Sequence, residues 1–203
     1  MKKINEKDFK EAAKTLGVEV AIIKAVCEVE APMGGFLQTG EPVILFERHK
    51  FHQFTDGVFS EKHPSISNPR AGGYTRGRRE HMLKGEHFRL QKAEKLNREA
   101  ALKSASWGKF QIMGFNYKLC GFSNIQTFIN AMYNSEKAQL KAFVNFIKSV
   151  GLSDELRRKD WKGFARGYNG RAYYKNAYDK KLKRAYINQI QKSYDKKLSN
   201  QCS

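Results

Sequence analysis

Glu30 stands at a position where a carboxyl group is unusual. The residues VEVAIIKAVCEVE at 18–30 have the periodicity of a helix, and at about 100° per residue Glu30 lies on the same side as the apolar Val26. The helix dipole also disfavours a negative charge at a helix C-terminus. Partial burial at such a position raises the pKa of a carboxyl group, which suits a general acid. The alternative is that Glu30 simply ends the helix beside a lysine or arginine.

Glu28 lies two residues before Glu30 but points to almost the opposite side of the same helix. It follows Lys24 by four residues, which is the spacing of an ion pair on the solvent face of a helix. The two carboxylates are therefore not interchangeable, and only Glu30 is a candidate for chemistry.

The stretch SWGKFQIMG at 106–114 places Phe and Gln between two glycines, with a Trp directly before the first glycine. A turn that only packs needs no glutamine, and a polar surface loop needs no large apolar side chains. The combination indicates the wall of a cleft. For Trp107 alone, an ordinary place in the core is the alternative.

The elements that position these residues are mostly helices. A short β-type run, VILF at 43–46, interrupts them, and 60–80 carries the prolines and glycines of an extended loop. The helical segments are expected at 6–16, 18–30, 86–103, 124–149 (as one helix or two), from about 160 to 170, and within 171–198. The pattern predicts a mainly α fold, a helical bundle with a small β element near residues 43–49. We expect 1–203 to form a single domain, because no linker or repeat divides it.

The charge of the chain indicates what kind of partner it meets. A formal net charge of +18 attracts polyanions such as nucleic acid, anionic lipid or an acidic wall polymer. Residues 171–198 hold nine lysines and arginines against two aspartates, with Tyr, Leu and Ile recurring every four residues. That repeat drifts around a straight helix, so the segment is expected to pack on the body by its first half. A solvated terminal helix without a partner is the alternative.

Other features of the sequence exclude several classes of protein. The three cysteines, Cys27, Cys120 and Cys202, lack metal-ligand spacing and predict buried, reduced thiols. The five histidines form no zinc motif, so no metal and no cofactor is expected. No apolar run has the length of a membrane span, and the first residues lack the apolar core of a secretory signal. Synthesis in the cytoplasm is therefore expected.

Four segments carry a resemblance to a known family. AVCEVEAPMGGF, EPVILFERHKF, SNPRAGGYTRG and SASWGKFQIMGFN, in this order, resemble the phage-type N-acetylmuramidase family of peptidoglycan-degrading endolysins. The matches run in order from about residue 18 to 117, and weaker helical similarity continues to about 190. The resemblance implies an α+β lysozyme-like fold and a bacteriolytic hydrolase that cleaves the MurNAc–GlcNAc bond of peptidoglycan.

A looser similarity to goose-type lysozymes and lytic transglycosylases implies roles for individual residues. In those proteins a helix-terminal Glu is followed by a Ser-x-Gly-x-x-Gln turn and a Tyr-Asn-Gly segment. Here Glu30, the turn with Ser106 and Gln111, and the pair Tyr168 and Asn169 correspond to them. The resemblance thus implies Glu30 as the catalytic acid and the four others as substrate-binding residues. Ala31 stands where a Ser commonly follows the acid, which removes one hydroxyl near the site.

A glycosidase also needs a group that activates water or stabilises the oxocarbenium-like centre. Glu47 is the candidate, because it ends the β-type run inside the resembling motif, and His49 on the same strand face is expected to orient it. A buried salt bridge is the alternative for Glu47, and Asp56 and Glu41 are the reserve carboxylates. Without a second carboxylate, a lytic transglycosylase that uses the substrate's own 6-hydroxyl group is the alternative chemistry.

The expectation is therefore a monomeric endolysin that acts on bacterial peptidoglycan. Its basic segment at 171–198 is the expected contact to anionic outer-membrane or wall polymers, and it would reach the wall after another protein opens the membrane. The competing classes are a nucleic-acid-binding protein, for which no motif is present, and a non-catalytic wall-binding module. The latter would need neither Glu30 nor the Gln111 turn.

Overall fold

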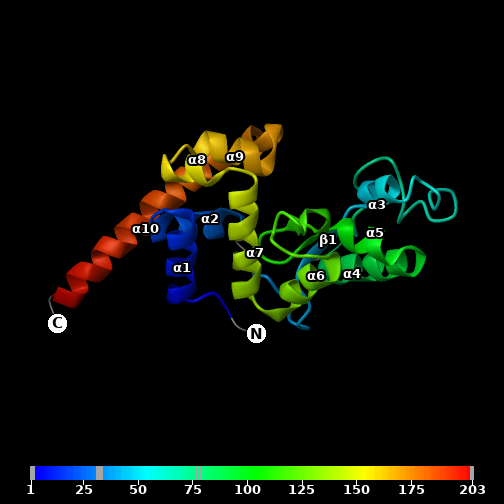
Figure 1. Ribbon diagram of the computed structural model, residues 1–203, viewed down its shortest axis with the longest axis horizontal. Helices are drawn as coiled ribbons and strands as arrows, with labels where there is room; N and C mark the ends of the chain where they lie inside the picture. The colour runs from blue at the N-terminus through cyan, green and yellow to red at the C-terminus, as the bar shows by residue number, and fades with distance from the viewer. Residues whose placement is uncertain (1–2, 31–33, 76, 78, 202–203) are drawn as a thin grey trace. The chain divides into compact units, whose positions relative to one another are not determined.

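The computed structural model in Figure 1 describes residues 3–30, 34–75, 77 and 79–201. The chain forms two compact units: Met1–Lys3 with Gly34–Phe143, and Ile4–Met33 with Val144–Ser203. We call them the sheet unit and the helical unit. The boundary at 143/144 falls within helix α7 (Glu136–Ser149). That 1–203 act as one catalytic domain stays a prediction, since a functional domain can contain two compact units.

The sheet unit is built around a small antiparallel sheet. Its strands β1 (Ile44–Phe46), β2 (Ala105–Trp107) and β3 (Ile112–Met113) are ordered β1-β2-β3, with Leu45 opposite Ser106 and Trp107 opposite Ile112. The turn between β2 and β3 requires Gly108, because its φ is +68° and a Cβ there would lie 2.6 Å from the side chain of Gln139. The stretch between the two glycines is thus a tight hairpin.

Helices of the sheet unit surround these strands. They are α3 (Arg48–Phe54), α4 (Arg79–Leu96), α5 (Arg98–Lys103), α6 (Ile125–Asn134), the first part of α7, and the 3₁₀ turn η1 (Gly114–Asn116). Their apolar faces bury a core with the sheet, whose largest fully buried members are Phe46, Phe51, Trp107, Phe128 and Phe143. Phe110 is also buried and stacks on Phe143 at 4.5 Å between ring centroids. Trp107 and Phe110, the two aromatic residues of the stretch at 106–114, are therefore core residues.

The helical unit begins with two capped helices. Asn5 forms a reciprocal capping box with Asp8 at the start of α1 (Glu6–Leu16), and Gly17, at φ +68°, ends that helix. Helix α2 (Val20–Glu30) follows and buries Ile22, Ile23 and Val26. These residues come from one side of α2, and the burial confirms the apolar face on which Glu30 was placed.

The remaining helices of this unit come from the end of the chain. They are α8 (Ser153–Arg157), α9 (Trp161–Asn169), the 3₁₀ segment η2 (Arg171–Asn176) and α10 (Tyr178–Gln201). The first half of α10 packs on α2 through the buried Leu182 and Ala185. Its last turns, red in Figure 1, extend beyond the other helices of the unit and expose Tyr194 and Leu198. Packing by the first half alone is as predicted.

The structure corrects two of the predicted elements. The β-type run is a strand only at Ile44–Phe46, and residues 48–54 continue as α3. The predicted helix at 86–103 begins earlier, at Arg79, and is divided at Asn97. Asn97 divides it because its side chain accepts a hydrogen bond from the amide of Ala100 at 3.0 Å and so starts a new helix. The mainly helical fold with a small β element is confirmed.

Two further findings concern the cysteines and the helices. Cys27 and Cys120 are buried and not joined in a disulfide, and burial raises the pKa of the Cys120 thiol to about 12. Cys202 lies outside the described residues.

Within the part of the chain that the structure describes, no helix is both long and apolar enough to span a bilayer.

Candidate functional site

Glu30 is the last residue of α2, and its carboxyl group is largely withdrawn from solvent. Its Oε1 accepts a hydrogen bond of 2.9 Å from the side-chain amide of Asn169. Burial raises the pKa of Glu30, while the Asn169 hydrogen bond and the positive charge of Lys181 oppose that rise. The desolvated carboxyl predicted at this helix end is therefore present.

Local structure explains how Asn169 reaches this carboxyl group. The side chain of Asp160 caps α9 by accepting from the amide of Gly163 at 2.9 Å, and Asn169 is the last residue of that helix. Gly170 follows at φ +78° and ends the helix. The structure shows the amide of Asn169 donating to Glu30, and the expected contact of Asn169 with substrate stays a prediction.

Two residues of α10 that the sequence analysis did not single out interact with Glu30 electrostatically. The pKa of Tyr178 is raised by burial and further by the negative charge of Glu30. Lys181 contributes the positive charge that opposes the pKa rise of Glu30. The two residues are three apart at the start of the basic segment, which is the helical spacing that could have revealed them.

Tyr168 lies within an aromatic cluster of the helical unit. Its ring stacks on Phe164 at 5.7 Å between centroids and meets the edge of Phe146 at 6.1 Å. The half-buried ring therefore has a packing role, and its contact with a sugar stays a prediction. Ala31, the departure from the goose-type pattern, lies outside the described residues.

The predicted ion pair between Lys24 and Glu28 is wrong. Lys24 instead pairs with Glu6 of α1 at 2.7 Å, and Glu28 accepts a hydrogen bond of 2.7 Å from the side-chain amide of Gln189 on α10. Neighbouring helices offer both side chains closer partners than their own helix does. Glu28 is nevertheless exposed, as expected for the side opposite Glu30.

Glu47 is the N-cap residue of α3, in the sheet unit, but its side chain does not cap the helix. The hydroxyl group of Tyr74 donates to its carboxylate, with 3.0 Å to each of Oε1 and Oε2. Nδ1 of His49 lies 3.2 Å from Oε2, although it makes no hydrogen bond among the described residues. Burial raises the pKa of Tyr74 to about 12, with a further contribution from Glu47. A phenol group held protonated in this way remains a donor to the carboxylate.

The predicted strand face for Glu47 and His49 is wrong, because α3 begins at Arg48. The two side chains still meet at the start of α3, where Nδ1 of His49 lies 3.2 Å from Oε2 of Glu47. The buried salt bridge with an arginine, considered as an alternative for Glu47, is not among the ion pairs described. Tyr74 was missed as an individual residue, although it stands in the resembling motif SNPRAGGYTRG.

A buried ion pair fixes both segments that meet at Glu47. Glu86 of α4 is 1% exposed; its Oε2 accepts from the amide of Phe46 at 3.0 Å, and its Oε1 accepts from the amide of Thr75 at 2.9 Å. Arg89 donates to Glu86 at 2.7 Å and to the carbonyl of Phe46 at 3.2 Å. Phe46 precedes Glu47 and Thr75 follows Tyr74, so this pair sets the geometry of the Tyr74–Glu47 contact.

Ser106 and Gln111 lie together across the β2–β3 hairpin. The Ser106 hydroxyl donates to Oε1 of Gln111 at 2.9 Å, and Nε2 of Gln111 donates to the carbonyls of Gly108 at 2.8 Å and Val43 at 3.2 Å. These bonds explain the glutamine between the two glycines, because its amide holds the turn closed while φ of Gln111 is +49°. Gln111 is exposed, and its contact with a ligand stays a prediction.

The reserve carboxylates have other surroundings. Asp56 is exposed in a turn at φ +49° after α3, and Glu41 lies in the loop before β1.

Among the described residues, no group of three or more His, Cys, Asp or Glu side chains is placed to hold a metal ion.

Comparison with known proteins agrees with this architecture. The chain matches the crystal structure of Burkholderia AP3 phage endolysin with a TM-score of 0.86 and 38% sequence identity, over 93% of this chain and 72% of that one. A search of curated proteins finds no match. The helices, the small antiparallel sheet and the desolvated carboxyl at a helix end define a lysozyme-like protein of the endolysin class.

Residues 19–190 match the N-acetylmuramidase family, and the chain belongs to that family. It is accordingly a peptidoglycan hydrolase, with peptidoglycan as its substrate.

Proposed function

We propose that the protein is a muramidase that cleaves the MurNAc–GlcNAc bond of peptidoglycan, with Glu30 as the general acid. The observation that carries the proposal is the desolvated carboxyl of Glu30, held by Asn169 at 2.9 Å. A glycosidic bond breaks when an acid protonates the leaving oxygen, and a raised pKa lets the carboxyl group keep that proton to a higher pH than an exposed glutamate would. The family of the chain supports the same reaction.

The Asn169 contact also supports a particular location for the proton. An amide N–H donates only to an acceptor, so Oε1 of Glu30 is the unprotonated oxygen when the carboxyl group is neutral. Oε2 then carries the proton toward the leaving oxygen. Asn169 is thus proposed as a residue that positions the acid, in addition to the substrate contact expected from the sequence.

Glu47 is proposed as the second catalytic carboxylate, which activates water or stabilises the oxocarbenium-like centre. The hydroxyl of Tyr74 donates to both its oxygens at 3.0 Å. Nδ1 of His49 lies 3.2 Å from Oε2. Both contacts support a fixed orientation of the carboxyl group, which this role requires.

Gln111 and Tyr168 are proposed as residues that contact sugar, and Ser106 as the residue that orients Gln111. Gln111 is the best supported, because it is exposed and an amide oxygen that accepts one bond from Ser106 retains a second lone pair. Ser106 is buried and acts through Gln111. The side chain of Tyr168 is only half-buried, so part of it remains accessible to a ligand.

The first test is mass spectrometry of the soluble products that wild type and Glu30→Gln release from purified peptidoglycan. Reducing MurNAc ends from wild type, lost in Glu30→Gln, are the expected result. Glu28→Gln is the matched control, because it removes the same charge from the exposed side of the same helix. Anhydro-muramic ends would instead identify a lytic transglycosylase, and full activity of a folded Glu30→Gln would refute Glu30 as the acid.

The role of Glu47 needs its own measurement. Glu47→Gln is expected to lose most activity while retaining its fold, and the anomer released first, observed by NMR, distinguishes inversion from retention. Azide rescue of a small variant, Glu47→Ala, would give a glycosyl azide of inverted configuration in either mechanism, and it would support Glu47 as the group on the face opposite the leaving oxygen. Unchanged turnover in Glu47→Gln would exclude it as the second group.

We also propose that α10 contacts anionic wall or outer-membrane polymers. Lys183, Arg184 and Lys192 are exposed on a helix whose last turns also expose Tyr194 and Leu198. Basic and apolar side chains together favour binding to an anionic amphiphilic surface. A monomer made in the cytoplasm, which reaches the wall once another protein has opened the membrane, is the proposed setting.

A further inference from the structure

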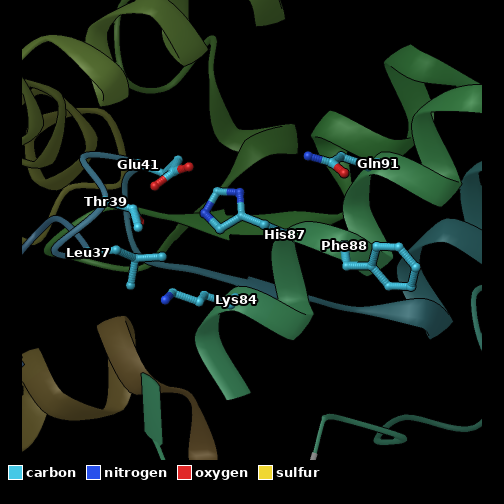
Figure 2. Close-up of a pocket in the computed structure, with 7 residues that line it drawn as sticks. All are labelled: Leu37, Thr39, Glu41, Lys84, His87, Phe88 and Gln91. Carbon is cyan, nitrogen blue, oxygen red and sulfur yellow. The ribbon is translucent and has the colours of Figure 1, made fainter. Parts of the chain in front are cut away.

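A small pocket of the sheet unit lies beside the loop that leads into β1. Its volume is about 220 Å³, and its lining consists of Leu37, Thr39, Glu41, Lys84, His87, Phe88 and Gln91 (Figure 2). The first three come from the loop, and the other four occur at helical spacing on one face of α4. None of these residues takes part in the reaction proposed above.

The two walls of the pocket are joined and therefore preformed. The loop is closed by a β-bridge between Phe36 and Pro42 and by a hydrogen bond of 2.8 Å from the amide of Leu37 to the carbonyl of Glu41. Nε2 of His87 lies 2.8 Å from the carbonyl oxygen of Pro42, which attaches α4 to the loop. Figure 2 shows the ring of His87 directed toward the loop that carries Thr39 and Glu41.

Glu41 supplies a carboxylate oxygen that has no partner. Its Oε2 is covered from solvent and makes no hydrogen bond with any described residue. A hydrogen bond from Thr39 and the charges of His87 and Lys84 lower the pKa of Glu41, so the group is anionic at neutral pH. A covered anionic oxygen without a donor is costly, and an ammonium group of a ligand would satisfy it.

The other polar groups of the pocket favour a ligand that carries both charges. Lys84 adds a positive charge opposite to that of Glu41, so the pocket attracts neither a simple cation nor a simple anion strongly. Phe88, 58% exposed, and the buried Leu37 offer apolar surface for a short aliphatic chain. A pocket of this size with one carboxylate and one ammonium complements an amino-acid centre that has its own ammonium and carboxylate.

We infer that this pocket binds the zwitterionic end of a diamino-acid side chain in the stem peptide of the peptidoglycan substrate, with Glu41 pairing to its ammonium group and Lys84 to its carboxylate. Among the groups that a peptidoglycan offers, only such a diamino dicarboxylic acid presents both charges on one carbon. The choice of a wall peptide rests on the proposed function. The recognition of a zwitterion rests on the pocket alone.

The test uses the full chain and peptides without any sugar, so it does not depend on hydrolysis. The tripeptide L-alanyl-γ-D-glutamyl-meso-diaminopimelate is titrated into ¹⁵N-labelled protein. Amide shifts at Thr39, Gly40 and Gln91 are expected to saturate together. Acetylation of the side-chain amine, replacement of the diamino acid by L-lysine, and Glu41→Gln should each weaken binding by about tenfold or more. Glu61→Gln, which removes an exposed acid of the same unit, should bind as wild type does.

Several outcomes would overturn the inference. These are the absence of saturable shifts, equal binding of the acetylated peptide, wild-type binding by folded Glu41→Gln, and shifts confined to other residues. Free meso-diaminopimelate carries the same zwitterionic end and is expected to bind as well, so binding of the tripeptide without binding of the free amino acid would overturn recognition through the zwitterion. Failure of the muramidase proposal is detected separately, by the product analysis of Glu30→Gln.

Discussion

The side-chain amide of Asn169 donates to Oε1 of Glu30 over 2.9 Å, and this bond joins the last residue of α9 to the last residue of α2. Two helix ends separated by most of the chain thus share one polar contact in the helical unit. The bond opposes the pKa rise that burial imposes on Glu30, and it orients the carboxyl group. Acid strength and acid geometry therefore depend on the same residue.

Asn169→Ala should lower kcat and shift its pH dependence. Loss of the hydrogen bond removes a contribution that lowers the pKa of Glu30, so the alkaline limb of the pH–kcat profile should move to higher pH. kcat at the optimum should fall by about 10-fold or more, because the acid is less well positioned. A pH–rate series on soluble glycan checks both effects. Asn188→Ala, at an exposed position of α10, is the control, and an unmoved alkaline limb would contradict the positioning role.

Glu30→Gln should stabilise the protein at neutral pH while reducing kcat by about 10²–10⁴-fold. Burial raises the folded-state pKa of Glu30, so the folded state retains a proton that the unfolded chain has lost. Stability therefore falls as the pH rises from the unfolded pKa, about 4.3, through the folded value. The variant avoids this loss, and each kcal/mol gained raises Tm by about 2–4 °C.

Thermal unfolding at pH 7 and at pH 4 measures this difference. The Tm advantage of Glu30→Gln should be present at pH 7 and largely absent at pH 4, where both states of wild type hold the proton. Glu28→Gln should show no such pH-dependent advantage, because Glu28 is exposed. An advantage of equal size at both pH values would mean that burial of the charge is not its cause.

Tyr74→Phe should weaken catalysis through Glu47. The substitution keeps the ring and removes the hydroxyl that lies 3.0 Å from both carboxylate oxygens. A hydrogen bond to a charged group contributes about 1.5–3 kcal/mol, so kcat/KM should fall by about 10-fold or more. Steady-state kinetics on soluble glycan measure this loss. Tyr117→Phe serves as the matched control in the same unit, and an unchanged kcat/KM in a folded Tyr74→Phe would refute the proposal.

Glu86→Gln should destabilise the protein strongly. It leaves Arg89 buried without its counter-charge, and breaking a buried pair in this way costs about 3–5 kcal/mol. Urea denaturation is the measurement. Glu94→Gln on the same helix should cost less than about 1 kcal/mol, since its contact with Arg98 is a surface pair at 3.8 Å. Similar losses in the two variants would show that the Glu86–Arg89 pair does not fix the segments beside Glu47.

Neutralising α10 should reduce binding to anionic polymers more than neutralising another helix. The triple variant Lys183→Ala, Arg184→Ala, Lys192→Ala changes exposed residues of α10. The control variant Lys7→Ala, Lys10→Ala, Lys14→Ala removes the same charge from exposed positions of α1. Co-sedimentation with anionic lipid vesicles at physiological salt compares them. Equal loss in both would mean that only the net charge of the protein matters.

Much of this protein is determined by local sequence. Asn5, Gly17 and the apolar spacing of 18–30 specify α1 and α2 without help from the rest of the chain, because capping and periodicity act over a few residues. The same periodicity separates Glu30 from Glu28. The drift of the four-residue apolar repeat also predicted that the first half of α10 packs and its second half does not.

Tertiary structure decided the partners of these residues. No local pattern shows that Glu30 meets Asn169, that Tyr74 meets Glu47, or that Lys24 prefers Glu6 over Glu28. Residues 48–54 illustrate the same limit, since the β-type run at 43–46 did not reveal that the helix α3 begins at Arg48. Partner choice depends on which helices and loops approach one another, and burial then shifts a pKa by removing water. Both effects arise between segments far apart in the chain, so the sequence identified the acid but only the fold showed how it is held.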